Sequence, residues 1–162
     1  MKNIVIKSIL GCYNISEEKI VTIDNFKNTL NNKLILITGA GGGIGFETAK
    51  YFAEMGATII ILEINKEKGI LAEKEINLKF PGKAEFYHID LADEKSIFAM
   101  KDYILNKYGC PDIIFNNAAI LHLGQIDKVS SEDWDNGYLV NFKYNILLVK
   151  SFFSYFYISF WF

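Results

Sequence analysis

The sequence contains few of the residues that build metal centres and disulfide frameworks. Its 162 residues include two cysteines, Cys12 and Cys110, and two histidines, His88 and His122. The cysteines match no metal-binding or redox spacing, so we expect both to be reduced thiols. Two distant histidines form no metal signature, and His88 is expected to be a satisfied residue at the edge of the core. We therefore predict no metal site.

The sequence also has no large excess of positive or negative charge and few long uncharged runs. The net charge is −2 and no stripe of basic residues is present, which predicts no nucleic-acid partner. The stretch from Tyr144 to Phe162 contains Lys150, and its uncharged part is shorter than the roughly 20 apolar residues of a membrane span. We therefore expect no membrane association, with a membrane helix at 144–162 as the weaker alternative. Lys7 interrupts the first apolar segment and no clear small-residue cleavage site follows, so we expect no secretory signal and a cytoplasmic location.

What the sequence does contain is an alternation of short apolar runs with amphipathic stretches, which is typical of parallel βαβ units. We expect strands at 34–38, 57–62, 84–89 and 112–116, and helices at 44–55, 66–79 and 93–108. A fourth helix is expected to begin at Ser130 or Ser131 and to continue through residues 151–153. The predicted fold is an α/β, Rossmann-like doubly wound parallel sheet, incomplete, with about four strands in the order 3-2-1-4.

A glycine-rich loop joins the first strand to the first helix. Residues 38–45 read Thr-Gly-Ala-Gly-Gly-Gly-Ile-Gly, which fits the spacing T-G-x-x-x-G-x-G. No lysine follows at the position that a phosphate loop of the lysine type requires. Glycines let a pyrophosphate lie against main-chain N–H groups at the positive end of a helix. The candidate cofactor-binding residues of this loop are Gly39, Gly42, Gly43, Ile44 and Gly45.

Glu63 follows the second apolar run, at the strand end where a dinucleotide site meets the adenine-side ribose. A carboxylate there accepts hydrogen bonds from the ribose hydroxyls and repels the additional phosphate of NADP. We therefore predict NAD as the cofactor.

Two further strand ends suggest a family. Residues 86–91 read Phe-Tyr-His-Ile-Asp-Leu and residues 113–119 read Ile-Ile-Phe-Asn-Asn-Ala-Ala. Together with the loop, they make residues 33–156 resemble the classical short-chain dehydrogenases/reductases, although the family usually has Asn-Asn-Ala-Gly where Ala119 stands here. The resemblance implies that Asp90 and Leu91 contact the adenine, and that Asn117 and Ala118 bring the fourth strand close to the adenosine.

The resemblance also bears on catalysis. Asn141 matches the family's asparagine that helps to hold a proton-relay water. The family's catalytic serine, tyrosine and lysine are expected downstream of that position, and the given sequence does not contain them there. The one Tyr-x-x-x-Lys motif, Tyr103 to Lys107, precedes the fourth strand and is interpreted as a pair on a surface helix.

We divide the chain into three parts: an N-terminal extension of unknown role at 1–32, an NAD-binding Rossmann domain at 33–150 and an aromatic tail at 151–162. In the extension, residues 4–10 and 19–23 could pair as a hairpin. The tail has eight aromatics in twelve positions and no charge, and we interpret it as an aberrant end produced by an altered reading frame or a premature stop. The fourth strand is expected to be an open, adhesive edge.

Three functional hypotheses follow. The first is the cofactor-binding half of an NAD-dependent short-chain oxidoreductase, which transfers hydride between the nicotinamide and a hydroxyl or carbonyl of a small-molecule substrate, with this chain alone inactive. The second is a non-catalytic NAD-binding module. The third is a structural partner whose open sheet edge docks a second chain; a homo-oligomer is an alternative assembly.

Overall fold

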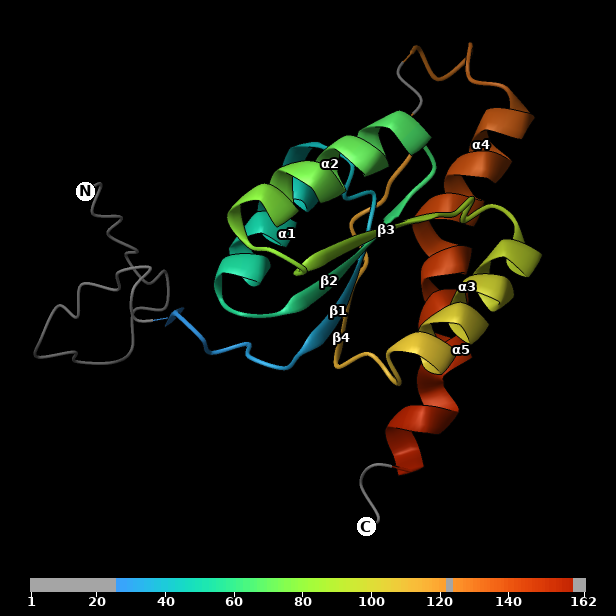
Figure 1. Ribbon diagram of the computed structural model, residues 1–162. Coiled ribbons are helices and arrows are strands. Elements are labelled where there is room, and N and C mark those ends of the chain that lie inside the picture. The colour runs from blue at the N-terminus through green and yellow to red at the C-terminus, as the bar shows by residue number, and fades with distance from the viewer. Residues whose placement is uncertain (1–25, 122–123, 159–162) are drawn as a thin grey trace, which may run out of the picture.

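The computed structural model describes residues 26–121 and 124–158. Four parallel strands form one sheet in the order β3-β2-β1-β4 (Figure 1). The strands are β1 (Leu34–Thr38), β2 (Thr58–Glu63), β3 (Ala84–His88) and β4 (Ile113–Phe115). The predicted α/β class and strand order are confirmed. The hairpin expected at residues 4–10 and 19–23 lies outside the described residues.

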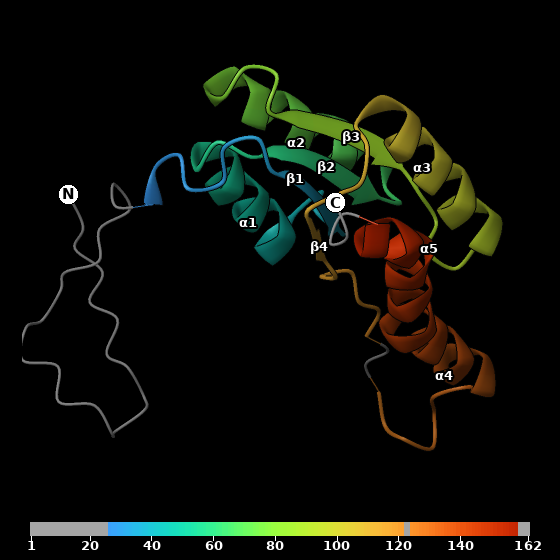
Figure 2. The same ribbon diagram turned by 90° about the horizontal axis from the view of Figure 1, so that it is seen from below.

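Helices connect the strands and cover both faces of the sheet. They are α1 (Gly43–Glu54), α2 (Lys66–Lys79), α3 (Glu94–Lys107), α4 (Ser131–Tyr138) and α5 (Tyr144–Ile158), with a π-helical turn, η2 (Leu139–Lys143), between the last two. The expected bounds agree with these to within one residue, and the fourth helix does continue past residue 153. In Figure 2, α1 and α2 lie on one face of the sheet and α3 and α5 on the other.

Alternate side chains of the buried strands enter opposite layers of the core, as the two-residue period of a strand requires. Leu36 of β1 contributes to the cluster that includes α3 and α5, whereas its neighbours Ile35 and Ile37 contribute to the cluster that includes α1 and α2. These three side chains are fully buried. The uninterrupted apolar runs at 34–37 and 59–62 therefore reflect strands covered on both faces.

Local sequence signals explain where most helices begin. The side chains of Asn65, Asp93 and Ser130 each accept a hydrogen bond from a main-chain N–H in the first turn of α2, α3 and α4. Ser130 and Asp133 form a capping box, which confirms the expected start of the fourth helix. The start of α1 is different: the N-cap residue is Gly42, no side chain caps the helix, and no acidic residue lies in its first turn.

No helix among residues 26–121 and 124–158 is long and apolar enough to cross a membrane.

Candidate functional site

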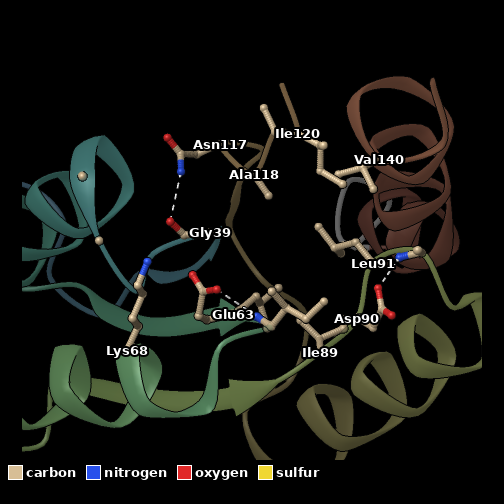
Figure 3. Close-up of a pocket in the computed structure, with 16 residues that line it drawn as sticks. Gly39, Glu63, Lys68, Ile89, Asp90, Leu91, Asn117, Ala118, Ile120 and Val140 are labelled. Atoms are coloured by element: carbon tan, nitrogen blue, oxygen red, sulfur yellow. Dashed lines mark hydrogen bonds between the residues drawn. The ribbon is translucent and has the colours of Figure 1, made fainter. Parts of the chain in front are cut away.

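The carboxyl ends of all four strands converge on one cavity of about 600 Å³. Figure 3 shows its lining, with the glycine loop on one side, the ends of β2 and β3 below and the segment after β4 above. Eight of the predicted site residues line this cavity: Gly39, Gly42, Gly43, Glu63, Asp90, Leu91, Asn117 and Ala118. In an open parallel sheet, this edge beside the switch in strand order is where ligands bind.

Hydrogen bonds hold the glycine loop against the end of β4. The buried Thr38 hydroxyl oxygen accepts from the N–H groups of Asn117 and Ala118, both at 2.9 Å. In return, the Asn117 side-chain amide donates to the carbonyls of Thr38 at 3.0 Å and Gly39 at 3.2 Å. Gly39 has φ of +65°, and a Cβ there would lie 3.0 Å from the Cα of Ala118. Strand ends separated by about 80 residues are thereby fixed to each other.

Gly45 and Ile44 have positions different from those of the other loop residues. Neither is among the residues that line the cavity, and Ile44 is 76% exposed. A Cβ on Gly45 would lie 2.5 Å from the Asn117 amide nitrogen and 2.6 Å from the Gly39 carbonyl oxygen. Gly45 therefore allows α1 to start directly beneath the loop, and contact of Ile44 and Gly45 with a cofactor stays a prediction.

The start of α1 is suited to an anion. Gly42 and Gly43 line the cavity, and Cβ atoms built on them would meet no atom within 4 Å, so this part of the loop is open. The first N–H groups of a helix lack partners within it and carry partial positive charge. Because no side chain caps α1, these groups are available to a ligand, which fits a phosphate.

Glu63 joins the glycine loop to the turn after β2. Its Oε2 accepts from the Gly41 N–H at 3.0 Å, and its Oε1 accepts from the N–H groups of Ile64 and Asn65, also at 3.0 Å. A Cβ on Gly41 would lie 2.8 Å from the Glu63 Cγ, so the close approach needs a glycine there. Gly41 was not among the predicted site residues, although as a glycine of the same loop it could have been included.

Asp90 and Leu91 form the rim at the end of β3. Asp90 Oδ1 accepts from the Ala92 N–H at 2.8 Å, which fixes the turn, and Leu91 is 8% exposed. An acidic side chain beside an apolar one can bind a flat heterocycle with amino groups through a hydrogen bond and a packing contact.

Asn141 lies in η2 and acts on the cavity through another residue. Its Oδ1 accepts from the Ile120 N–H at 2.8 Å, and its Nδ2 donates to the Ile120 carbonyl at 2.9 Å. Ile120 lines the cavity, whereas Asn141 does not. The segment after β4 is thus tied to the last helices, and the water-holding role of Asn141 stays a prediction.

The cavity also has lining residues that were not predicted. Lys68 of α2 directs its ammonium group toward the glycine loop, beside the Glu63 carboxylate (Figure 3). The others are Leu62, Ile64, Ile89, Ala92, Ala119, Ile120 and Val140. Lys68 could have been suspected from its place in the first turn after Glu63, whereas Val140 and Ile120 meet only through the tertiary fold.

The Tyr-x-x-x-Lys motif belongs to a different region. Lys107 Nζ lies 2.9 Å from the Tyr103 hydroxyl, and both side chains donate to the carboxylate of Glu85, near the amino end of β3. The Tyr108 hydroxyl donates to the same carboxylate. The pair is therefore part of an ion-paired cluster outside the cavity. The sequence interpretation of Tyr103 and Lys107 as a pair on a surface helix did not include their contact with Glu85.

Burial raises the pKa of Glu85, but hydrogen bonds from Lys107, Tyr103 and Tyr108 outweigh that effect and leave it below its ordinary value. Burial, together with the hydrogen bond to Glu85, raises the pKa of Tyr108 to about 12. The charges of Glu85 and Lys107 are thus paired with each other within this cluster.

Within the part of the chain that the structure describes, no three His, Cys, Asp or Glu side chains gather as metal ligands. His88 Nε2 lies 3.1 Å from the Ile64 carbonyl oxygen, and Cys110 is a free thiol. His122 and Cys12 lie outside the described residues.

Comparison with known proteins shows to which family the chain is related. The family model described as short chain dehydrogenase matches residues 33–159. The 3-oxoacyl-[acyl-carrier-protein] reductase FabG of Thermotoga maritima is 38% identical over 114 residues, which are 70% of this chain and 46% of that reductase. Cyclopentanol dehydrogenase of Comamonas sp. is 35% identical over 112 residues, 69% of this chain and 44% of that enzyme.

Solved structures of oxidoreductases are also similar to this chain. A metagenomic short-chain oxidoreductase in complex with NADP is 30% identical, with a TM-score of 0.71 over 76% of this chain and 56% of its own. An NAD⁺-bound xylitol dehydrogenase is 29% identical, also with a TM-score of 0.71, over 76% of this chain and 47% of its own. The chain spans about half the length of the curated relatives it matches.

Proposed function

The chain belongs to the short chain dehydrogenase family, and on that premise we propose that it binds NAD and forms the cofactor-binding half of an NAD-dependent oxidoreductase. The observation that carries this proposal is the start of α1, where two open glycines and an uncapped helix end face a cavity of about 600 Å³. Such a helix end binds phosphate without any basic side chain.

The other rim residues suit the rest of the dinucleotide. In this proposal the pyrophosphate lies on the glycine loop, the adenine-side ribose meets Glu63, and the adenine lies between Asp90 and Leu91. Asn117 and Ala118 form the opposite wall. Bound cofactor would accept hydride as NAD⁺ or donate it as NADH, and the residues that line the cavity would orient it.

The choice of NAD over NADP rests on Glu63. Relatives of this fold are found with either cofactor, so the fold alone does not decide the matter. A carboxylate beside the adenine-side ribose accepts a hydrogen bond from the 2′-hydroxyl of NAD and repels the 2′-phosphate of NADP. The three N–H donors that hold Glu63 orient its carboxylate at the rim.

We also propose that this chain binds the cofactor without turnover. What supports this is the position of Tyr103 and Lys107, whose polar atoms are engaged with Glu85 outside the cavity. The second candidate function, a non-catalytic NAD-binding module, rests on the same observation. Saturable binding without steady NAD reduction is expected from both.

Calorimetric titration of the purified chain with NAD and with NADP tests the proposal. We expect NAD to bind more tightly, and Glu63→Ala to reduce the NAD-over-NADP preference by about tenfold, as loss of one charge-assisted contact requires. Because Glu63 also supports Gly41, both affinities can fall; the ratio reports the ribose contact separately. Glu67→Ala, an acidic residue in the first turn of α2, is the matched control. An unchanged ratio in Glu63→Ala would reject NAD selection, and no binding of either dinucleotide would reject the function.

A further inference from the structure

Lys68 brings a positive charge to the cavity at the carboxyl ends of the strands. It lies in the first turn of α2, where its N–H donates to the Asn65 side chain at 3.0 Å. Its side chain lines the cavity and directs the ammonium group toward the glycine loop, beside the Glu63 carboxylate (Figure 3). Of the described residues that line this cavity, only Lys68 has a basic side chain. It is therefore the side chain there that can attract an anion by its charge.

The ammonium group of Lys68 forms no ion pair within the described part of the chain. Other lysines do pair with a carboxylate, as Lys33 does with Asp112 at 2.7 Å and Lys107 with Glu85 at 2.6 Å. An ammonium group without such a partner, at the wall of a cavity, can bind an anionic ligand without first losing a protein contact.

The carboxylate of Glu63 has main-chain partners instead of Lys68. Its Oε2 accepts from the Gly41 N–H, and its Oε1 accepts from the N–H groups of Ile64 and Asn65, each at 3.0 Å. A carboxylate has about four acceptor positions, so these three hydrogen bonds use most of them. Two opposite charges therefore lie next to each other at the rim without a direct ion pair.

Gly41 is the point that both side chains pass. A Cβ built on Gly41 would lie 2.8 Å from the Glu63 Oε2 and 2.9 Å from the Lys68 Cβ. The flexible four-carbon stem of a lysine lets its ammonium group adjust to a ligand. A ligand group that meets Glu63 is therefore within reach of Lys68 as well.

The ligand group that suits this arrangement is a phosphate beside the adenine-side ribose. In the proposed function Glu63 meets the hydroxyls of that ribose, and NADP differs from NAD there by its 2′-phosphate. The carboxylate repels this phosphate, whereas an unpaired ammonium group beside the carboxylate attracts it. The solved structures similar to this chain include one complex with NADP and one with NAD⁺, so the fold admits either.

We propose that Lys68 is a specificity-determining residue that binds the 2′-phosphate of NADP and so limits the preference for NAD that Glu63 imposes. The chain then binds both dinucleotides, and the opposite charges of Glu63 and Lys68 set the ratio of the two affinities. This inference rests on the proposed function, because it needs the adenine-side ribose to lie at Glu63.

Calorimetric titration of Lys68→Met with NAD and with NADP tests this role. We expect the affinity for NADP to fall about fivefold, the upper range for a solvent-exposed charge pair, and the affinity for NAD to stay within about twofold. Lys68→Arg, which keeps the charge, should retain most of the NADP affinity. Lys66→Met removes the same charge from the same turn of α2 but from outside the cavity lining, and it should leave the ratio unchanged.

A second background makes the effect easier to measure. In Glu63→Ala the repulsion of the 2′-phosphate is gone, so NADP binding depends more strongly on Lys68. Adding Lys68→Met to Glu63→Ala should therefore lower the affinity for NADP at least fivefold and again leave NAD almost unchanged. Raising the salt concentration from about 0.05 M to about 0.5 M should reduce this difference, because exposed charges are screened.

The outcomes separate this inference from the proposed function. An unchanged ratio of NAD to NADP affinity in Lys68→Met would overturn the role of Lys68 alone. Equal weakening of both dinucleotides would also overturn it, since the ammonium group would then act on the shared pyrophosphate. Failure of the wild type to bind either dinucleotide would reject the proposed function and this inference together. If Lys68→Met does not fold, as judged by circular dichroism, Lys68→Gln takes its place in the same titrations.

Discussion

Replacing Gly45 by alanine tests whether the glycine loop is as closely packed as the structure shows. In a helix, alanine is favoured over glycine by about 1 kcal/mol, so propensity alone predicts a more stable protein. The new Cβ would lie 2.5 Å from the Asn117 amide nitrogen and 2.6 Å from the Gly39 carbonyl oxygen. The Asn117 side chain could turn away from the new Cβ, but the Gly39 carbonyl belongs to the main chain and can move only if the loop itself shifts.

The expected change in unfolding free energy follows from these contacts. Overpacking of this kind costs about 1–3 kcal/mol. Displacing the Asn117 amide also weakens its hydrogen bonds to Thr38 and Gly39, at about 1 kcal/mol each. After the gain in propensity, we expect Gly45→Ala to destabilise the protein by about 1–4 kcal/mol. The effect has the opposite sign to that of an ordinary helix glycine.

Urea unfolding followed by circular dichroism measures this difference. The matched control is Gly42→Ala, in the same loop, where φ of −175° suits any residue and a Cβ meets no atom within 4 Å. That variant should change stability by less than about 1 kcal/mol. Equal or greater stability of Gly45→Ala relative to the wild type would refute the close packing of α1 beneath the loop.

Further predictions concern other contacts. Thr38→Val leaves two main-chain N–H groups at the end of β4 without their acceptor; urea unfolding should show a loss of about 2–5 kcal/mol, most of it recovered in Thr38→Ser. Gly69→Ala places a Cβ 2.2 Å from the Phe86 ring, so we expect about 1–3 kcal/mol of destabilisation, partly offset by Phe86→Leu in a double-mutant cycle. Because the folded-state pKa of Glu85 is depressed, its contribution is present above its unfolded pKa and is lost as the pH falls through the folded value. The stability difference between wild type and Glu85→Gln should therefore shrink from pH 7 to pH 3; a constant difference would contradict the assigned ion pair with Lys107.

Much of the fold could be predicted because local signals specify it. Apolar runs such as 59–62 are covered on both faces and read as strands without reference to other segments. Caps and stops are equally local, as at Ser130 or at residues 80–82. Strand β4 is shorter than expected, Ile113–Phe115 instead of 112–116.

The features that the sequence analysis missed depend on distant segments. Glu85 meets Tyr103 and Lys107 only because α3 packs beside the edge strand β3. The pairing of Asn141 with Ile120 spans 21 residues, and Asn141 lies in a π-helical turn that was not expected from the sequence. Val140 and Ile120, which line the cavity from separate elements, are likewise brought together by tertiary geometry.

The π-helical turn η2 changes the rotational phase of a continuous helical segment. Such a turn accommodates one more residue than an α-helical turn, and one residue corresponds to about 100° of rotation about the helix axis. Helix α4 before it has no buried residue, whereas α5 after it buries Tyr144, Leu148 and Phe152. Without this offset, the stripe that α5 directs into the core would be rotated by about a quarter of a turn, and the open side of the helix would move with it. Five residues therefore set which side of α5 faces the core and which side remains exposed.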